Sequence, residues 1–515
     1  MSKTQIKKSQ ASNKRIAKNT LMLYIRQILI MFVGLYTVRV VLKTLGIEDY
    51  GIYNVVSGTV TMFGFFSGAM AVGSQRFFSF YIGKNDARSL SDAFHCTLTI
   101  YVVLALSIVV LGESIGIWFI NNKLIIPESR LFAANCIFQI SIISFVISML
   151  SSPFMAVIMS HEEMGVYAKV GIVEVLLKLA IVFALVLLPF DKLICYGVLL
   201  FLVSIIIILI YGNYCVHKYV ECSLTLKWDK QLIKEITEYS GWNLFGNFAW
   251  IVKNQGTSFM LNIFFGPVMN AAQNLAMQIR TIVNTFSTNF TSSVHPQIVK
   301  LYAKNEYKSM FSLMGSSCKL SFMLMVVITV PMILNLDYIL SIWLVDVPAH
   351  AATFTKIMLV EASFEAMSTP TAAVNQATGK IKYYQMIIGF LGIVNLPISY
   401  LFLTLGFPSE SVYIISLILQ TFIILNRMVF LERIEKKISI YILKDIFVPC
   451  FITGILSYAV CYFLYVKTFS FTSTVLTIMY EVVIVSVIGF IVALNVDEKK
   501  FLINVIRKSL IKLKL

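Results

Sequence analysis

Long apolar segments follow one another along nearly the whole chain, and they constrain its fold more than any other feature. A bilayer core about 30 Å thick is crossed by a helix of about 20 apolar residues, because each helical residue advances about 1.5 Å. We expect about fourteen membrane spans, at residues 19–42, 51–72, 93–119, 131–158, 166–188, 194–216, 240–265, 271–294, 310–335, 351–374, 383–404, 411–431, 446–466 and 473–494.

The composition excludes a water-soluble fold. Hydrophobic residues make up 58% of the 515 positions and charged residues 13%, whereas soluble domains contain about 45–50% apolar and about 25% charged residues. The sequence therefore predicts an all-α polytopic membrane protein. The eight cysteines form no CxxC pair and no metal-binding spacing with histidine, so we expect neither disulfides nor a metal site.

The distribution of basic residues predicts the orientation in the membrane, because cytoplasmic loops are enriched in Lys and Arg. If the N-terminus is cytoplasmic, most of the 42 basic residues lie in cytoplasmic tails and loops, and the opposite loops contain Lys43, Lys123, Arg130, Lys192 and Lys467. We therefore expect a multi-pass plasma-membrane protein with both termini in the cytoplasm. Basic loops facing anionic headgroups also account for the net charge of +16.

An internal repeat relates the two halves of the chain. A shift of 220 residues places Gly46 on Gly266, Asn54 on Asn274, and Lys84-Asn85-Asp86 on Lys304-Asn305-Glu306. Six spans separate the matching segments, and because six is an even number the two copies have the same orientation in the membrane.

The repeat predicts two six-helix lobes around a central cavity, followed by two further helices. The expected divisions are a cytoplasmic N-terminal tail (1–18), a first lobe (19–216), a cytoplasmic linker (217–239), a second lobe (240–431), two extra spans (446–494) and a basic amphipathic cytoplasmic tail (495–515).

Several ionisable residues lie within the expected spans, where each costs about 2.5–3.5 kcal/mol on insertion scales. Arg26 and Arg39 in the first span are 13 residues apart, so they point roughly 140° away from each other. Both are candidates for a cationic substrate site. We expect Arg26 to face a cavity, whereas Arg39 could instead extend to the outer interface.

Lys253 and Arg280 lie near the middle of adjacent spans of the second lobe, and neither has an acidic residue one turn away. They predict a cavity lined by cations. The alternative is that each pairs with a carboxylate from another helix.

Glu361 and Glu365 share one helix face, and two carboxylates in an apolar setting cannot both ionise cheaply. We therefore expect at least one to hold a proton, which would suit ion coupling. The alternative is pairing with Lys253, Arg280 or Lys356. Glu174 is a third coupling candidate, although Lys178 four residues later could neutralise it.

The sequence contains no feature of an enzyme. Its five histidines have no motif relation to a nucleophile or a metal ligand, and no phosphate-binding or dinucleotide-binding motif is present. We therefore expect no cofactor and no catalysis, and a substrate or ion gradient must drive any transport.

Several stretches match a known group of membrane proteins. They are Phe264-Phe265-Gly266-Pro267 with Asn270-Ala271-Ala272, His295-Pro296-Gln297-Ile298-Val299-Lys300, Ala377-Thr378-Gly379-Lys380-Ile381-Lys382 and Ser160-His161-Glu162-Glu163-Met164. Over nearly its whole length the chain resembles the Wzx-type polysaccharide flippases of the multidrug/oligosaccharidyl-lipid/polysaccharide exporter superfamily. One departure is Gln273, which stands where the resemblance leads us to expect a basic residue.

The resemblance implies transport of undecaprenyl-pyrophosphate-linked oligosaccharide repeat units across the bacterial inner membrane, for O-antigen, capsule or related polysaccharide. It implies a lipid-linked oligosaccharide substrate, membrane lipid, a polysaccharide polymerase and a chain-length regulator as partners, and no nucleic acid. Three alternatives stay open: a multidrug or organic-cation antiporter of the same superfamily, a peptidoglycan-precursor flippase, and a membrane scaffold for polymer assembly.

Overall fold

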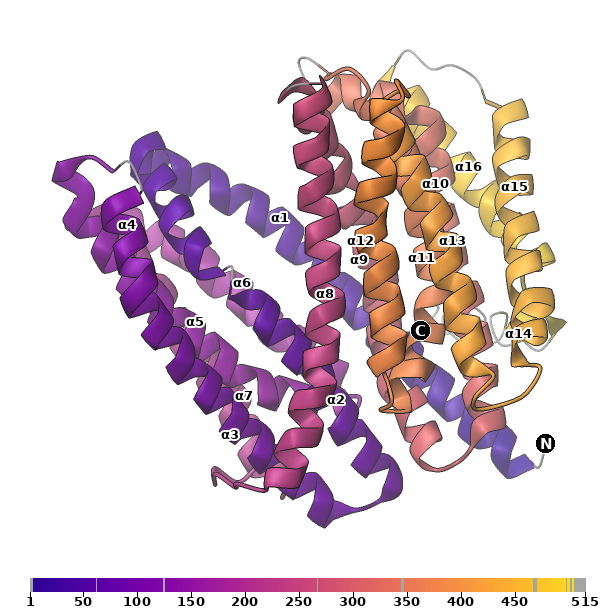
Figure 1. Ribbon diagram of the computed structural model, residues 1–515, viewed down its shortest axis with the longest axis horizontal. Coiled ribbons are helices and arrows are strands. Elements are labelled where there is room, and N and C mark those ends of the chain that lie inside the picture. The colour runs from indigo at the N-terminus through magenta and orange to yellow at the C-terminus, as the bar shows by residue number, and fades with distance from the viewer. Residues whose placement is uncertain are drawn as a thin grey trace, which may run out of the picture. The chain divides into compact units, whose positions relative to one another are not determined.

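The computed structural model describes residues 3–61, 63–123, 126–265, 267–343, 347–465, 470–496, 498–500 and 503. Helices contain most of these residues, and none of them lies in a β-strand (Figure 1). The chain divides into two compact units. We call residues 17–244 the N-lobe, and residues 245–515 together with 1–16 the C-lobe.

The N-lobe is built from consecutive helices, most of them long enough to cross a bilayer. They are α1 (Lys3–Thr61, whose first residues group with the C-lobe), α2 (Gly64–Lys84), α3 (Ala87–Leu111), the π-helical turn η1 (Gly112–Gly116), α4 (Ile117–Lys123), the 3₁₀ turn η2 (Glu128–Arg130), α5 (Leu131–Ser160), α6 (Met164–Leu187), α7 (Lys192–Lys218) and the start of α8 (Lys230–Phe265).

The C-lobe continues with the rest of α8. It contains α9 (Pro267–Ala303), α10 (Tyr307–Trp343), α11 (Ala351–Ala377), α12 (Lys382–Thr404), α13 (Ser411–Leu431), α14 (Ile438–Tyr441), the π-helical turn η3 (Ile442–Phe447), α15 (Val448–Phe463) and α16 (Phe471–Val492). The last two helices pack against each other and against α10.

The helix boundaries follow the 220-residue repeat. Helix α3 begins at Ala87 and α10 at Tyr307, and helices α5 and α11 begin at Leu131 and Ala351. The turn before each of the first pair is also the same, because Asn85 and Asn305 both adopt a left-handed conformation, with φ of 55° and 58°. Two copies of one six-helix arrangement therefore form the two lobes.

One helix is central to the packing of each lobe. In the N-lobe, α5 contacts α2, α3, α6 and α7, and its buried residues Ile137, Phe138 and Ile142 belong to an apolar cluster. In the C-lobe, the equivalent helix α11 contacts α9, α10 and α13. A residue on α11 is therefore positioned by three neighbouring helices.

The first two expected spans differ from the observed helices. Helix α1 runs through the loop expected at 43–50 and kinks at Gly46, whose φ of 82° interrupts the helical geometry. The second span was expected to end at residue 72, but α2 continues to Lys84. Within the extension the Arg76 guanidinium lies over the rings of Phe77 and Phe80, a favourable cation–π contact.

Nine helical segments among the described residues are long and apolar enough to cross a membrane. The count of fourteen spans stays a prediction. Helices α8, α9 and α11 are not among the nine, because polar and charged side chains interrupt their apolar runs. The tail expected at 495–515 lies largely outside the described residues.

Candidate functional site

The candidate site lies inside the C-lobe on the central helix α11. Glu361 and Glu365 are four residues apart, so both carboxylates project from one face of this helix. Its hydroxyl side chains are satisfied by its own carbonyl oxygens, as Ser363 Oγ donates to Leu359 O at 3.0 Å and Thr369 Oγ1 to Glu365 O at 2.8 Å.

Glu361 is the most buried member of the site, with 3% of its side chain exposed. Its Oε1 accepts hydrogen bonds from Lys253 Nζ at 3.1 Å and from Ser416 Oγ at 2.7 Å. Its Oε2 lies 3.6 Å from Arg280 Nη1. Three other helices, α8, α9 and α13, therefore place a polar group on this one carboxylate.

Arg280 connects the two carboxylates of α11. Its Nη2 donates to Glu365 Oε2 at 2.9 Å while its Nη1 faces Glu361. The Arg280 side chain is 10% exposed, whereas that of Glu365 is 32% exposed. The site is thus asymmetric, with one fully enclosed carboxylate and one that is partly accessible.

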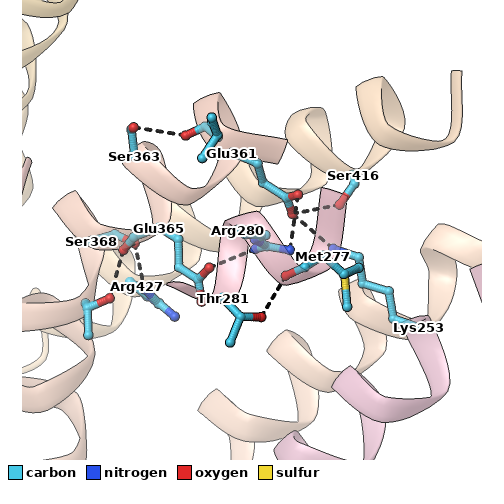
Figure 2. A network of polar contacts seen from close by, with 12 residues as sticks. Lys253, Met277, Arg280, Thr281, Glu361, Ser363, Glu365, Ser368, Ser416 and Arg427 are labelled. Atoms are coloured by element: carbon cyan, nitrogen blue, oxygen red, sulfur yellow. Dashed lines mark hydrogen bonds and ion pairs between the residues drawn. The ribbon is translucent and has the colours of Figure 1, made fainter. Parts of the chain in front are cut away.

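A third cation extends the network along the same face of α11 (Figure 2). Arg427 on α13 donates from Nη1 to Ser368 Oγ at 2.6 Å, and Ser368 is the residue one turn after Glu365. Among the described residues, no carboxylate lies within ion-pair distance of Arg427. The α11 network, defined as Lys253, Arg280, Glu361, Glu365 and Arg427, therefore contains three cations and two carboxylates.

A small polar cavity of about 10 Å³ adjoins the enclosed part of the α11 network, with room for about one water molecule. Among its lining atoms, Asn254 Nδ2, Gln273 Oε1 and Asn395 Nδ2 are buried and have no hydrogen-bond partner among the described residues. The lining residues are Lys253, Asn254, Thr257, Gln273, Met277, Arg280, Met358, Glu361, Asn395, Val412, Tyr413 and Ser416. These groups can bind a polar ligand or water.

The α11 network has no counterpart in the N-lobe. The positions 220 residues before Lys253, Arg280, Glu361, Glu365 and Arg427 are Val33, Val60, Ser141, Phe145 and Ile207. The two lobes have equivalent helices, but the five charged residues of the α11 network occur only in the C-lobe. The fold alone therefore does not require these charges.

Arg26 occupies a separate position within the N-lobe. Its guanidinium lies over the Tyr167 ring of α6, 4.4 Å from the ring centroid. A Cβ atom placed on Gly171 would lie 2.1 Å from Arg26 Nε, so a larger residue there would displace the Arg26 side chain. Arg26 Nε is buried without a hydrogen-bond partner among the described residues.

The remaining sequence candidates have simpler surroundings. Glu174 Oε1 accepts from Lys178 Nζ at 2.6 Å on a partly exposed face of α6, the pairing that their spacing suggested. The side chain of Arg39 lies outside the described residues.

The structure thus brings together four residues that the sequence singled out. It selects the alternative in which Lys253 and Arg280 pair with carboxylates from another helix. Glu361 and Glu365 each face a cation, which is the pairing alternative stated for them, and a proton-coupling role for either carboxylate stays a prediction.

Sequence reasoning missed Arg427, Ser416 and Asn395. Arg427 lies inside an expected span and could have been found by the same rule as Arg280, that charges at membrane depth are costly. Ser416 and Asn395 give no such signal, because uncharged polar residues are common in membrane helices.

Comparison with solved structures identifies the fold. The chain is similar to a multidrug resistance MATE family transporter of the MOP superfamily in an outward-facing conformation (12% identity, 81% of this chain and 96% of that chain, TM-score 0.70). It is also similar to a MATE protein in the bent conformation (14%, 83% and 97%, 0.69) and to the Vibrio cholerae MATE transporter VcmN, solved as a mutant (13%, 82% and 97%, 0.68). The fold is that of a two-lobed membrane transporter.

The family follows from two sequence comparisons. A model of the polysaccharide biosynthesis protein family matches residues 16–302, more than half of the chain, and a model of the MatE family matches residues 243–401. The chain belongs to the polysaccharide biosynthesis protein family, within the superfamily that the resemblance indicated. No curated protein matches the chain significantly by sequence.

Proposed function

We propose that the protein is a flippase that moves undecaprenyl-pyrophosphate-linked oligosaccharide repeat units across the bacterial plasma membrane by alternating access. The repeat units would serve O-antigen, capsule or related surface polysaccharide. Membership of the polysaccharide biosynthesis family supports the sugar part of this proposal. The α11 network supports the diphosphate part.

The charge balance of the α11 network is the observation that carries the proposal. Lys253 and Arg280 already neutralise both carboxylates, and Arg427 adds a cation with no acidic partner among the described residues. A diphosphate is an anion that lipid rejects, and guanidinium groups bind phosphate through two parallel hydrogen bonds. A site with excess positive charge favours such a headgroup over an organic cation.

Binding of a phosphate requires an exchange of ion partners. Glu365 is the carboxylate that can be exchanged, because it is 32% exposed and forms one ion pair, with Arg280. Glu361 is held by Lys253, Ser416 and Arg280 and is 3% exposed. In our proposal the phosphate replaces Glu365 on Arg280, and protonation of the released carboxyl couples proton binding to substrate binding.

The proposal is tested by restoring surface polymer in a flippase-null strain and by flipping of lipid-linked sugars in proteoliposomes. Lys253→Gln and Arg280→Gln should insert into the membrane but lose transport. Lys356→Gln is the matched control, because Lys356 is also a C-lobe lysine with an acidic partner, Asp337, but lies outside the α11 network. Full polymer from both network variants would contradict the cationic site.

A second candidate function is an organic-cation antiporter. It is favoured by one observation, that the MatE family model matches residues 243–401, which contain Lys253, Arg280, Glu361 and Glu365. Drug-resistance assays discriminate the two, because an antiporter should lose resistance in Glu365→Gln, whose carboxylate would be the cation ligand. A peptidoglycan-precursor flippase would instead be revealed by cell-wall arrest on depletion.

A further inference from the structure

A hollow of about 300 Å³ lies in the C-lobe and shares no lining residue with the α11 network. It is formed by the start of α10 and by the turn between α13 and α14. This volume is at the lower end of the range for small-ligand pockets, which runs from about 300 to 1,000 Å³. Its polar lining comes from Lys308, Ser312, Glu435, Lys436, Lys437 and Tyr441.

The hollow is strongly basic. Lys308 on α10 and the consecutive Lys436 and Lys437 contribute three ammonium groups, against one carboxylate from Glu435. None of the three lysines forms an ion pair with any residue in the described part of the chain. Their charges are therefore available to an anion, and an anion of one or two charges would match the excess.

The wall of the hollow is apolar and firmly packed. Phe311 and Ile438 are buried at 5% and 7% exposure. A Cβ atom on Gly315 of α10 would lie 2.9 Å from Tyr441 Oη, so the Tyr441 side chain extends from α14 to the surface of α10. The hollow is thus open to its surroundings, with exposed lysine side chains arranged around a buried apolar floor.

The hollow is at the level of a membrane interface. One candidate span ends at Leu431 and the next begins at Ile438, so the turn between them marks one boundary of the apolar layer. Ile440 and Leu443, next to the hollow, are 61% and 51% exposed. Apolar side chains that face outward beside a basic hollow fit a ligand that has a charged head and acyl chains.

The backbone of the turn is held in an unfavourable conformation. Lys437 has a φ of 67°, in the left-handed region that residues with a Cβ adopt at a cost of about 1 kcal/mol. Such conformations are enriched where a backbone presents a side chain for function.

We propose that this hollow binds the headgroup of an anionic phospholipid. The phosphate would lie among Lys308, Lys436 and Lys437, while Glu435 and Ser312 would accept hydrogen bonds from headgroup hydroxyls such as those of phosphatidylglycerol. Basic pockets between membrane helices bind anionic headgroups in this manner, and each lysine near the interface contributes about 1 kcal/mol. The inference is independent of the cargo that the transporter carries.

The test measures lipids retained by the full-length protein, by native mass spectrometry after extraction from vesicles of equal phosphatidylglycerol and phosphatidylcholine. The wild-type protein should retain phosphatidylglycerol preferentially. Lys436→Gln/Lys437→Gln should weaken this retention about thirty-fold, on the basis of two interfacial lysines. Lys380→Gln/Lys382→Gln, in the turn after α11 and at the first residue of α12, removes the same charge elsewhere and should have little effect.

A second variant separates the shape of the hollow from its charge. Ser312→Trp fills the hollow and leaves every lysine in place, so retention of phosphatidylglycerol should fall. The proposal is overturned if the Lys380→Gln/Lys382→Gln control loses as much lipid as the test variant, or if Ser312→Trp retains lipid like the wild type. It is also overturned if inorganic phosphate competes as well as the lipid does, because the ligand would then be a free anion.

Discussion

Replacement of Glu361 by glutamine tests whether the α11 network is held together by its central carboxylate. The change keeps the shape of the side chain and leaves an acceptor for Ser416, but removes the negative charge between Lys253 and Arg280. At separations of 3.1 and 3.6 Å, the two attractions are worth about 5 kcal/mol each for an effective dielectric constant of about 20.

The net loss is smaller than that sum because the desolvation of all three groups opposes it. Removing one partner from a buried ion pair costs about 3–5 kcal/mol. We therefore expect Glu361→Gln to lower the unfolding midpoint by about 3–5 °C, measured at one fixed scan rate in detergent or nanodiscs. Transport should be lost at temperatures where the protein remains folded.

Two controls make this prediction specific. Glu365→Gln removes a 32% exposed carboxylate, so its cost should be about 1 kcal/mol. In Lys253→Gln/Glu361→Gln the unpaired cation is also removed, so the double variant should be less destabilised than the sum of the single variants by about 1–3 kcal/mol. The reasoning is refuted if Glu361→Gln unfolds like the wild type, or if the double variant is additive.

Three further outcomes are expected. Arg427→Gln should strongly reduce transport of a phosphate-bearing headgroup in proteoliposomes but lower the unfolding midpoint only slightly. Equal transport by the variant and the wild type would contradict a role of Arg427 in binding the headgroup. Although burial opposes it, hydrogen bonds from a lysine and two tyrosines hold the pKa of the Glu163 carboxyl, just outside the membrane span, below its usual value. This stabilisation is present above the unfolded pKa and is lost as pH falls through the lowered one. Glu163→Gln should therefore flatten the fall in stability below the ordinary glutamate pKa in an acid titration of the unfolding midpoint. Gly171→Ala should lower stability by forcing Arg26 off its aromatic neighbour. Gly165→Ala is the control, because nothing lies within 4 Å of a new Cβ there. Equal unfolding midpoints for the two variants would show that the packing of Arg26 is unimportant for stability.

The fold could be predicted from the sequence because it depends on local backbone preferences and on the length and spacing of apolar segments. Runs of about 20 apolar residues identify spanning helices without knowledge of their neighbours. The 220-residue repeat was visible in a few polar positions, such as Asn85 and Asn305, because only certain residues tolerate a left-handed turn. The same reasoning failed at Gly46, where the chain kinks within α1 instead of forming a loop, and at residue 72, where α2 continues to Lys84.

The sequence also identified the charges that matter but not their partners. Lys253, Arg280, Glu361 and Glu365 were recognisable because ionised groups at membrane depth are costly wherever they occur. Which cation meets which carboxylate depends on how α8, α9 and α13 pack around α11, and the paired residues are 85 and 108 positions apart.

The tertiary structure alone decided the balance of charge in the site. Membrane helices carry their own backbone hydrogen bonds, so their residue pattern determines that they form but contains little information about which of their faces meet. The placement of Arg427 beside Ser368, the polar cavity near Asn395 and the separation of the two carboxylates all arise from that packing. The membrane helices were therefore determined by the sequence, and the chemistry of the site by the contacts between them.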